Sequence, residues 1–137
     1  MAEPQVHTMF ITSPPDDLNR VHEFLEQVWK DVPYVEMMDR FGFETALVEL
    51  AANIFRHADV GEGLECSVRV ETGDKCIVAL LTDSGVGGNV HLGDRPMPDV
   101  MDESGRGLLL IKALVDELHY ERQGEVNCWR ISKKLVP

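Results

Sequence analysis

Hydrophobic and polar positions divide the chain into short alternating segments and longer segments with a helical period. Alternation predicts a strand at residues 6–12 and a hairpin at 64–85, whose second strand (76–81) is almost wholly apolar. Such a strand is expected to be central and buried. Apolar residues every three or four positions predict two helices, an amphipathic one within 13–32 and a more apolar one that ends near Ala58.

The C-terminal part of the chain continues this pattern. Residues 88–104 carry glycine, proline and charge with little periodicity, which predicts a mobile loop. A third helix is expected over 105–118, and a final hairpin over 119–135 that turns at Gln123 and Gly124. This order predicts an α+β fold: a two-layer α/β sandwich, in which helices cover one face of a mixed, mainly antiparallel sheet. The strand–helix alternation of a doubly wound sheet is absent.

Composition narrows the class of protein. The 137 residues suit one domain, expected to span 1–137, and 24 acidic against 13 basic residues give a formal net charge of -11. A protein with this charge lacks the excess of basic residues that is typical of nucleic-acid-binding proteins. We expect a cytoplasmic protein, because the sequence shows no signal peptide and no long apolar run, and its three cysteines form no CxxC pair. An acidic protein that binds a polyanion needs a local device against repulsion, such as a metal ion or a helix N-terminus.

The first candidate motif lies in the second predicted helix, "FETALVELAANIFRHAD" (43–59). Glu49, Asn53 and His57 are spaced four apart, so they share one stripe on a helix that is apolar over most of its circumference. A carboxylate and an amide that face a core are costly unless they meet a partner, a metal ion or a ligand. A solvated stripe is the alternative. His57 is interpreted as structural.

The second motif is "LLTDSGVGG" (80–88), in which an apolar strand ends at Asp83 and Gly85 and Gly87 follow. An ordinary Asp-Ser-Gly turn is one interpretation. The other is a base-binding site, since a carboxylate at a strand end accepts a hydrogen bond from an exocyclic amine such as that of adenine, and glycines let a flat ring approach the backbone.

The third motif is "ESGRGLLLIKAL" (103–114). Ser104 can cap a helix whose first turn contains Gly105 and Gly107, although glycine costs helix stability there. A close approach to the backbone explains these glycines, and a phosphate fits because free amides and the helix dipole favour an anion. Arg106 can add a charge-assisted hydrogen bond or be merely solvated.

These motifs match neither a P-loop nor a dinucleotide fingerprint. Glu49 and Asn53 on a helix, an Asp-x-Gly-x-Gly turn, a loop and a Gly-x-Gly helix start resemble the three boxes of the GHKL ATPase superfamily, which has the Bergerat ATP-binding fold. Within it, "ELAANIFRHA", "TDSGVG" and "SGRGLLLIKALVDEL" resemble the anti-sigma-factor serine kinases of the RsbW and SpoIIAB type. Over the whole chain, the length and the order of elements are similar to that family. Glutamate at position 49, in place of histidine, argues against the histidine kinases.

The resemblance implies a role for each motif. Asn53 would coordinate Mg²⁺ between the ATP phosphates, and Glu49 would act as the general base. Asp83 would accept from the adenine amino group, with Gly85 and Gly87 close to the ring. The phosphate-closing segment would consist of Ser104, Gly105, Arg106 and Gly107, and residues 88–104 would form a lid.

The same resemblance implies partners. The expected function is that of an ATP-binding serine/threonine-protein kinase and anti-sigma factor, which phosphorylates a serine of a STAS-domain anti-anti-sigma protein and sequesters a sigma factor. A homodimer is expected, with no direct contact to nucleic acid or membrane. Acidic residues in the lid and Glu103 beside Ser104 depart from what phosphate binding favours. A noncatalytic, nucleotide-dependent module that binds a partner is therefore the alternative.

Overall fold

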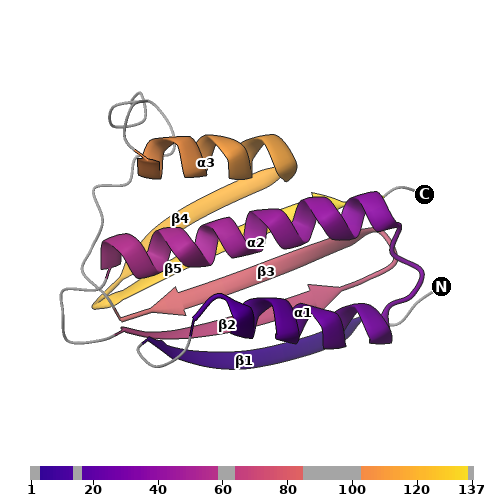
Figure 1. Cartoon of the computed structure of the whole chain (residues 1–137), viewed down its shortest axis with the longest axis horizontal. Helices are drawn as coiled ribbons and strands as arrows, with labels where there is room; N and C mark the ends of the chain where they lie inside the picture. The colour runs from indigo at the N-terminus through magenta and orange to yellow at the C-terminus, as the bar shows by residue number, and fades with distance from the viewer. Residues whose placement is uncertain (1–3, 14–16, 59–63, 85–102, 136–137) are drawn as a thin grey trace.

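A computed structural model describes residues 4–13, 17–58, 64–84 and 103–135. All three helices cover the same face of a five-stranded sheet (Figure 1). The elements are β1 (Gln5–Ser13), α1 (Asn19–Asp31), α2 (Met37–Ala58), β2 (Leu64–Thr72), β3 (Cys76–Asp83), α3 (Glu103–Leu114), β4 (Glu117–Gln123) and β5 (Val126–Lys134).

The sheet confirms the predicted fold class and sharpens it. Its strand order is β1-β2-β3-β5-β4, and each of the four pairings among the described strands is antiparallel. The apolar strand β3 is the middle strand, as its composition predicted. Both expected hairpins are present, and the second turns at Gly124, whose φ of 64° is a conformation that glycine adopts without strain.

The core lies between the sheet and the helices, because alternate residues of each strand point to the same side. One row across the sheet, Met9, Val68, Leu81 and Trp129, is wholly apolar and buried. The helix α2 presses a stripe of fully buried residues onto this face, namely Phe43, Ala46, Leu47, Leu50 and Ala51. Burial of each large side chain contributes roughly 1.5–3 kcal/mol. The core thereby fixes the position of α2 over the sheet.

Two helix boundaries differ from the sequence-based prediction. The first helix begins at Asn19, well after Ser13, which belongs to β1. The third helix ends at Leu114, four residues before the predicted end, because residues from Glu117 onward pair with β5. Lys133 Nζ donates to the Leu114 carbonyl (3.3 Å), and the Asp116 amide donates to Ser132 O (2.8 Å). Pairing with a neighbouring strand overrides the local helical pattern there.

A buried charge near the start of α2 has a partner. Asp39 is only 4% exposed, and its Oδ1 lies 3.9 Å from Lys133 Nζ of β5. The same ammonium group donates to the carbonyl of Leu114, so it links α2, β5 and the end of α3. A buried carboxylate needs such compensation.

Among the described residues, no helix combines the length and apolar composition that crossing a membrane requires.

Candidate functional site

The elements that carry the three motifs meet at one end of the molecule. Figure 1 shows the C-terminal end of α2, the end of β3, the start of α3 and the turn between β4 and β5 at the same end of the sheet. This follows from the topology: α2 and β3 run toward this end, and α3 starts there. The fold thus brings together motifs that lie far apart in the sequence.

The first motif places two polar side chains on neighbouring turns of α2. Asn53 is 6% exposed, and its Oδ1 is buried with no hydrogen-bond partner among the described residues. Glu49, one turn earlier, is half-buried. A buried amide oxygen without a donor costs roughly 1–3 kcal/mol, so its retention needs a reason other than packing. The alternative of a solvated stripe does not describe Asn53.

The third motif meets the first. Gly107, in the first turns of α3, is buried, and a Cβ built on it would lie 3.5 Å from Glu49 Oε2. The backbone of α3 therefore faces the Glu49 carboxylate directly, and a side chain longer than that of alanine would have to displace it. The helix includes Glu103, so Ser104 lies inside its first turn and not at the capping position that we predicted. The backbone of Gly105 and Arg106 belongs to the same turn, whose amides have no intrahelical acceptor.

The second motif ends β3 at a buried carboxylate. Asp83 is 2% exposed on the helix-covered face, and its Oδ1 accepts a hydrogen bond from Asn127 Nδ2 of the adjacent strand β5 (2.9 Å). Cys66 pairs with Asp83 in the sheet register. Burial, reinforced by the negative charge of Asp83, raises the pKa of the Cys66 thiol from 9.0 to about 12. The thiol is therefore neutral at physiological pH.

Sequence reasoning missed Asn127 and its partners. Asn127 is 3% exposed, and its Oδ1 accepts from the Tyr120 hydroxyl (2.6 Å) and from Arg122 Nη1 (3.0 Å). The signal was present in the alternation of β5, because Asn127 shares its side of the strand with the buried Trp129 and Ile131. An amide in an otherwise apolar stripe marks a polar group that the core must satisfy.

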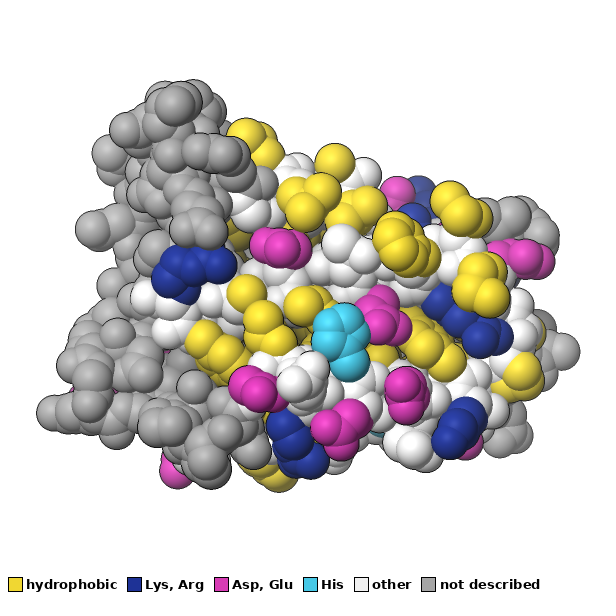
Figure 2. Space-filling model, in the orientation of Figure 1, with side chains coloured by type: hydrophobic (Ala, Val, Ile, Leu, Met, Phe, Trp, Pro, Cys, Tyr) yellow, Lys and Arg dark blue, Asp and Glu magenta, His cyan; other side chains and the backbone are white. Residues whose placement is uncertain are grey.

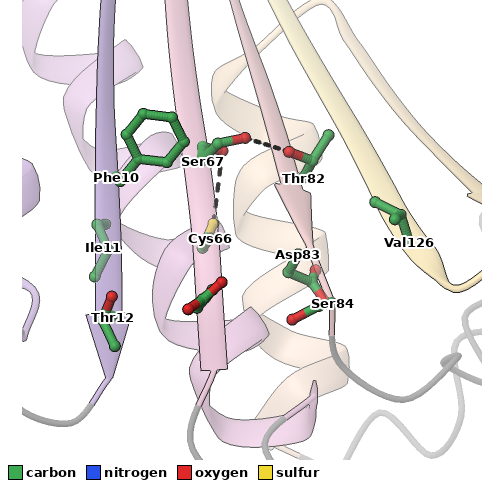
Figure 3. Close-up of a pocket in the computed structure, with 10 residues that line it drawn as sticks. Phe10, Ile11, Thr12, Cys66, Ser67, Thr82, Asp83, Ser84 and Val126 are labelled. Atoms are coloured by element: carbon green, nitrogen blue, oxygen red, sulfur yellow. Dashed lines mark hydrogen bonds between the residues drawn. The ribbon is translucent and has the colours of Figure 1, made fainter.

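Two pockets adjoin these residues. One, of about 460 Å³, opens at the ends of β1, β2 and β3 (Figure 3); its lining includes Asp83 and Ser84, together with Phe10, Ser67 and Thr82 of the uncovered sheet face. The other, of about 420 Å³, lies between α1 and α2 and reaches Glu49. Neither of these two is lined by both Asp83 and Asn53, so we identify neither with a complete nucleotide cavity.

Part of the predicted site lies outside the described residues. This applies to Gly85, Gly87 and residues 88–102 of the predicted lid. The side chains of His57, Ser104 and Arg106 are likewise not described, and their proposed roles stay predictions.

The residues that are described fit a bound Mg²⁺. Its preferred ligands are oxygens, and it is held by one or two protein groups together with phosphates and water. The Asn53 Oδ1 supplies such an oxygen, buried and without a donor among the described residues, and the Glu49 carboxylate lies one turn away. This chemistry suits a hard cation better than it suits a packed apolar core.

Comparison with known proteins agrees with this geometry. A model of the histidine kinase-like ATPase domain matches residues 11–133, so the chain belongs to that family. The family description is that of an ATPase, which implies ATP as the nucleotide. No curated protein matches the chain.

Two solved structures share the fold. The Acinetobacter baumannii histidine kinase AdeS is 15% identical, with a TM-score of 0.54 over 93% of this chain and 68% of that one. The histidine kinase domain of the Erythrobacter litoralis EL346 blue-light activated histidine kinase is also 15% identical, with a TM-score of 0.58 over 84% of this chain and 61% of that one. The chain thus spans less than two thirds of the second relative. At this identity, the likeness concerns the fold.

Proposed function

We propose that the chain is an ATP-dependent protein serine/threonine kinase that acts as an anti-sigma factor. The observation that carries the proposal is the meeting of Glu49 with Gly107, since a Cβ at Gly107 would lie 3.5 Å from the carboxylate. This contact brings the proposed base to the turn whose amides suit a phosphate. Asn53 supplies the adjacent buried oxygen. Membership in an ATPase family supports the nucleotide.

The proposed reaction is in-line phosphoryl transfer. Glu49 takes the proton of the acceptor serine hydroxyl, the serine oxygen bonds to the γ-phosphorus, and the bond to the β,γ-bridging oxygen breaks, so that ADP leaves. Mg²⁺, when bound with ATP, neutralises charge on the phosphates. Asn53 would hold the Mg²⁺ through its side-chain oxygen. Asp83 accepts a hydrogen bond from the adenine amine and fixes the far end of the nucleotide. Gly105, Arg106 and Gly107 close over the phosphates.

A protein substrate is favoured by the surface that leads to Glu49. The pocket between α1 and α2 is lined by Met37, Phe41 and Val48 as well as by Glu49. Met37 and Phe41 are 73% and 67% exposed, which is unusual for large apolar side chains. Figure 2 shows apolar side chains exposed between charged ones over the helix layer on this face. Exposed apolar groups in the pocket that reaches a proposed base are suited to contact with another protein.

The proposed partners follow the resemblance of the motifs to the RsbW and SpoIIAB kinases. They are a STAS-domain anti-anti-sigma protein, which would receive the phosphoryl group on a serine, and a sigma factor, which would be sequestered when the STAS protein is phosphorylated. A cytoplasmic homodimer is part of the proposal.

The nucleotide site is tested first by calorimetric titration with ATP, with and without Mg²⁺. We expect metal-dependent binding that Asn53→Ala weakens by roughly tenfold or more, which corresponds to about 1.4 kcal/mol. Asn19→Ala, at the exposed start of α1, is the matched control and should bind as the wild type does. No binding in either condition would exclude the kinase and leave an acidic interaction domain on an ATPase fold.

The alternative function is a noncatalytic module that uses the nucleotide only to hold a partner. The acidic residues of the lid segment favour it, because negative charge near phosphates opposes transfer. Glu49→Ala separates the two functions in an assay that follows [γ-³²P]ATP into candidate STAS-domain proteins. A kinase loses phosphorylation and keeps ATP binding, whereas a binding module shows no phosphorylation with either protein and captures its partner equally well.

A further inference from the structure

The hydrogen bonds around Asp83 form a chain that determines which way each group points. Arg122 can only donate, so the Asn127 atom that faces it at 3.0 Å must be the carbonyl oxygen Oδ1. Tyr120 donates to the same oxygen. The opposite side of the amide, Nδ2, is therefore directed at Asp83 Oδ1, 2.9 Å away. An amide is often ambiguous between its two orientations, but a purely donating neighbour removes the ambiguity here.

This arrangement makes Asp83 an acceptor. An N–H donor holds the plane of the carboxylate that it contacts, and a carboxylate can accept several hydrogen bonds at once. The strand partner Cys66 is a neutral thiol, so it adds no second negative charge. Asp83, Asn127 and Cys66 are only 2–3% exposed, so these contacts are largely shielded from bulk water.

We propose that Asn127 is a positioning residue that holds Asp83 as a hydrogen-bond acceptor and thereby sets a preference for 6-aminopurine over 6-oxopurine nucleotides. The inference rests on the proposed nucleotide site. The amine of adenine donates to a carboxylate, whereas the 6-oxo group of hypoxanthine presents lone pairs to lone pairs. A carboxyl group that is free to rotate or to take up a proton tolerates both bases. Sites built around one buried hydrogen bond reject the mismatched analogue strongly.

The experiment compares the dissociation constants of ATP and ITP, which differ at the purine 6 position, for the wild type and two variants. We expect the wild type to prefer ATP by roughly 100-fold or more, as one buried hydrogen bond and its repulsive counterpart allow. Asn127→Leu, which removes the donor, should lower this ratio by at least roughly tenfold. Binding of inorganic tripolyphosphate, which has no base, should not change.

Asn127→Asp gives a readout that a merely structural role would not produce. It keeps the size and the acceptor atoms for Tyr120 and Arg122, but it faces Asp83 with a second carboxylate. Two such carboxylates share a proton more readily than either ionises beside the other. At pH 6 the shared proton takes the place of the amide N–H between the two groups, whereas at pH 8 two ionised carboxylates repel each other and displace Asp83. We therefore expect this variant to bind ATP more weakly at pH 8 than at pH 6, in contrast to the wild type.

Each outcome decides the inference. A wild type that binds neither nucleotide overturns the proposed function and this inference together. If the wild type binds ATP, this inference alone is overturned by equal affinity for ITP, or by an unchanged preference in folded Asn127 variants. If those variants do not fold, Tyr120→Phe decides, because it removes one of the two donors to Oδ1 and should lower the preference roughly threefold; an unchanged preference overturns the inference.

Discussion

The two ends of α2 treat a buried polar side chain in opposite ways. Near its start, Asp39 lies beside the ammonium group of Lys133, which also binds the last carbonyl of α3. One to two turns from its end, Asn53 is equally buried, at 6% against 4% exposure, but its Oδ1 has no donor among the described residues. The first end holds elements together, and the second carries a buried oxygen, without a donor among the described residues, one turn from Glu49. The difference separates a structural polar group from one suited to a ligand.

We expect the largest change in the free energy of unfolding when the buried apolar stripe of α2, which supports both ends of the helix, is truncated. Leu50 is fully buried. Leu50→Ala should lower the free energy of unfolding by about 3 kcal/mol through lost burial and the cavity left behind. Denaturant unfolding measures this change. Leu109→Ala, at a 45% exposed position of α3, is the control and should change stability little. An equal loss in both variants would contradict the assignment of the core.

The next largest effect is expected at the start of α2, where Asp39 lies beside Lys133. Lys133→Met leaves Asp39 buried without its ammonium neighbour, and we expect the free energy of unfolding to fall by about 2 kcal/mol while ATP affinity is kept. Lys134→Met, at the next and exposed position of β5, should change neither quantity. Loss of ATP binding in Lys133→Met would show that the two ends are not independent.

A smaller effect concerns pH at the end that carries Asp83. The Cys66 thiol has a pKa of about 12 in the fold and 9.0 as its ordinary value. Below pH 9 both states keep the proton, so stability does not depend on this thiol. Above pH 9 the unfolded chain loses the proton first, and the free energy of unfolding should fall by about 1.4 kcal/mol per pH unit until about pH 12. The extra slope of the wild type over Cys66→Ala in denaturant titrations at pH 8–10.5 measures it; equal slopes would contradict it.

The smallest effect on stability is expected at Asn53, near the C-terminal end of α2. Asn53→Leu replaces a buried amide, whose oxygen has no donor among the described residues, with an apolar group of similar size. The free energy of unfolding should therefore stay within about 1 kcal/mol of the wild type or rise. ATP binding should be lost in the same variant. Thermal melts beside nucleotide titrations test both points. A loss of about 2 kcal/mol or more would make Asn53 a structural residue like Asp39.

The hydrophobic pattern predicted the helices and strands well where burial of one side was the only requirement on the segment. The alternation of β5 and the long apolar period of α2 reflect burial on one side, and both elements formed as expected. The predicted helix was too long by residues 115–118: from Asp116 onward the backbone forms hydrogen bonds with β5, although the helical period of the sequence continues. Propensity is weak, and a complete set of sheet hydrogen bonds outweighs it.

The sequence by itself determined the α+β class, the central place of β3 and the three motifs that indicate a nucleotide, because alternation, helical period and residue chemistry are local properties. Only the tertiary structure decided which residues meet. The contact of Gly107 with Glu49 joins positions 58 residues apart, and the hydrogen bond of Asn127 to Asp83 joins positions 44 apart. Such meetings depend on strand order and helix packing, which no short window of sequence encodes.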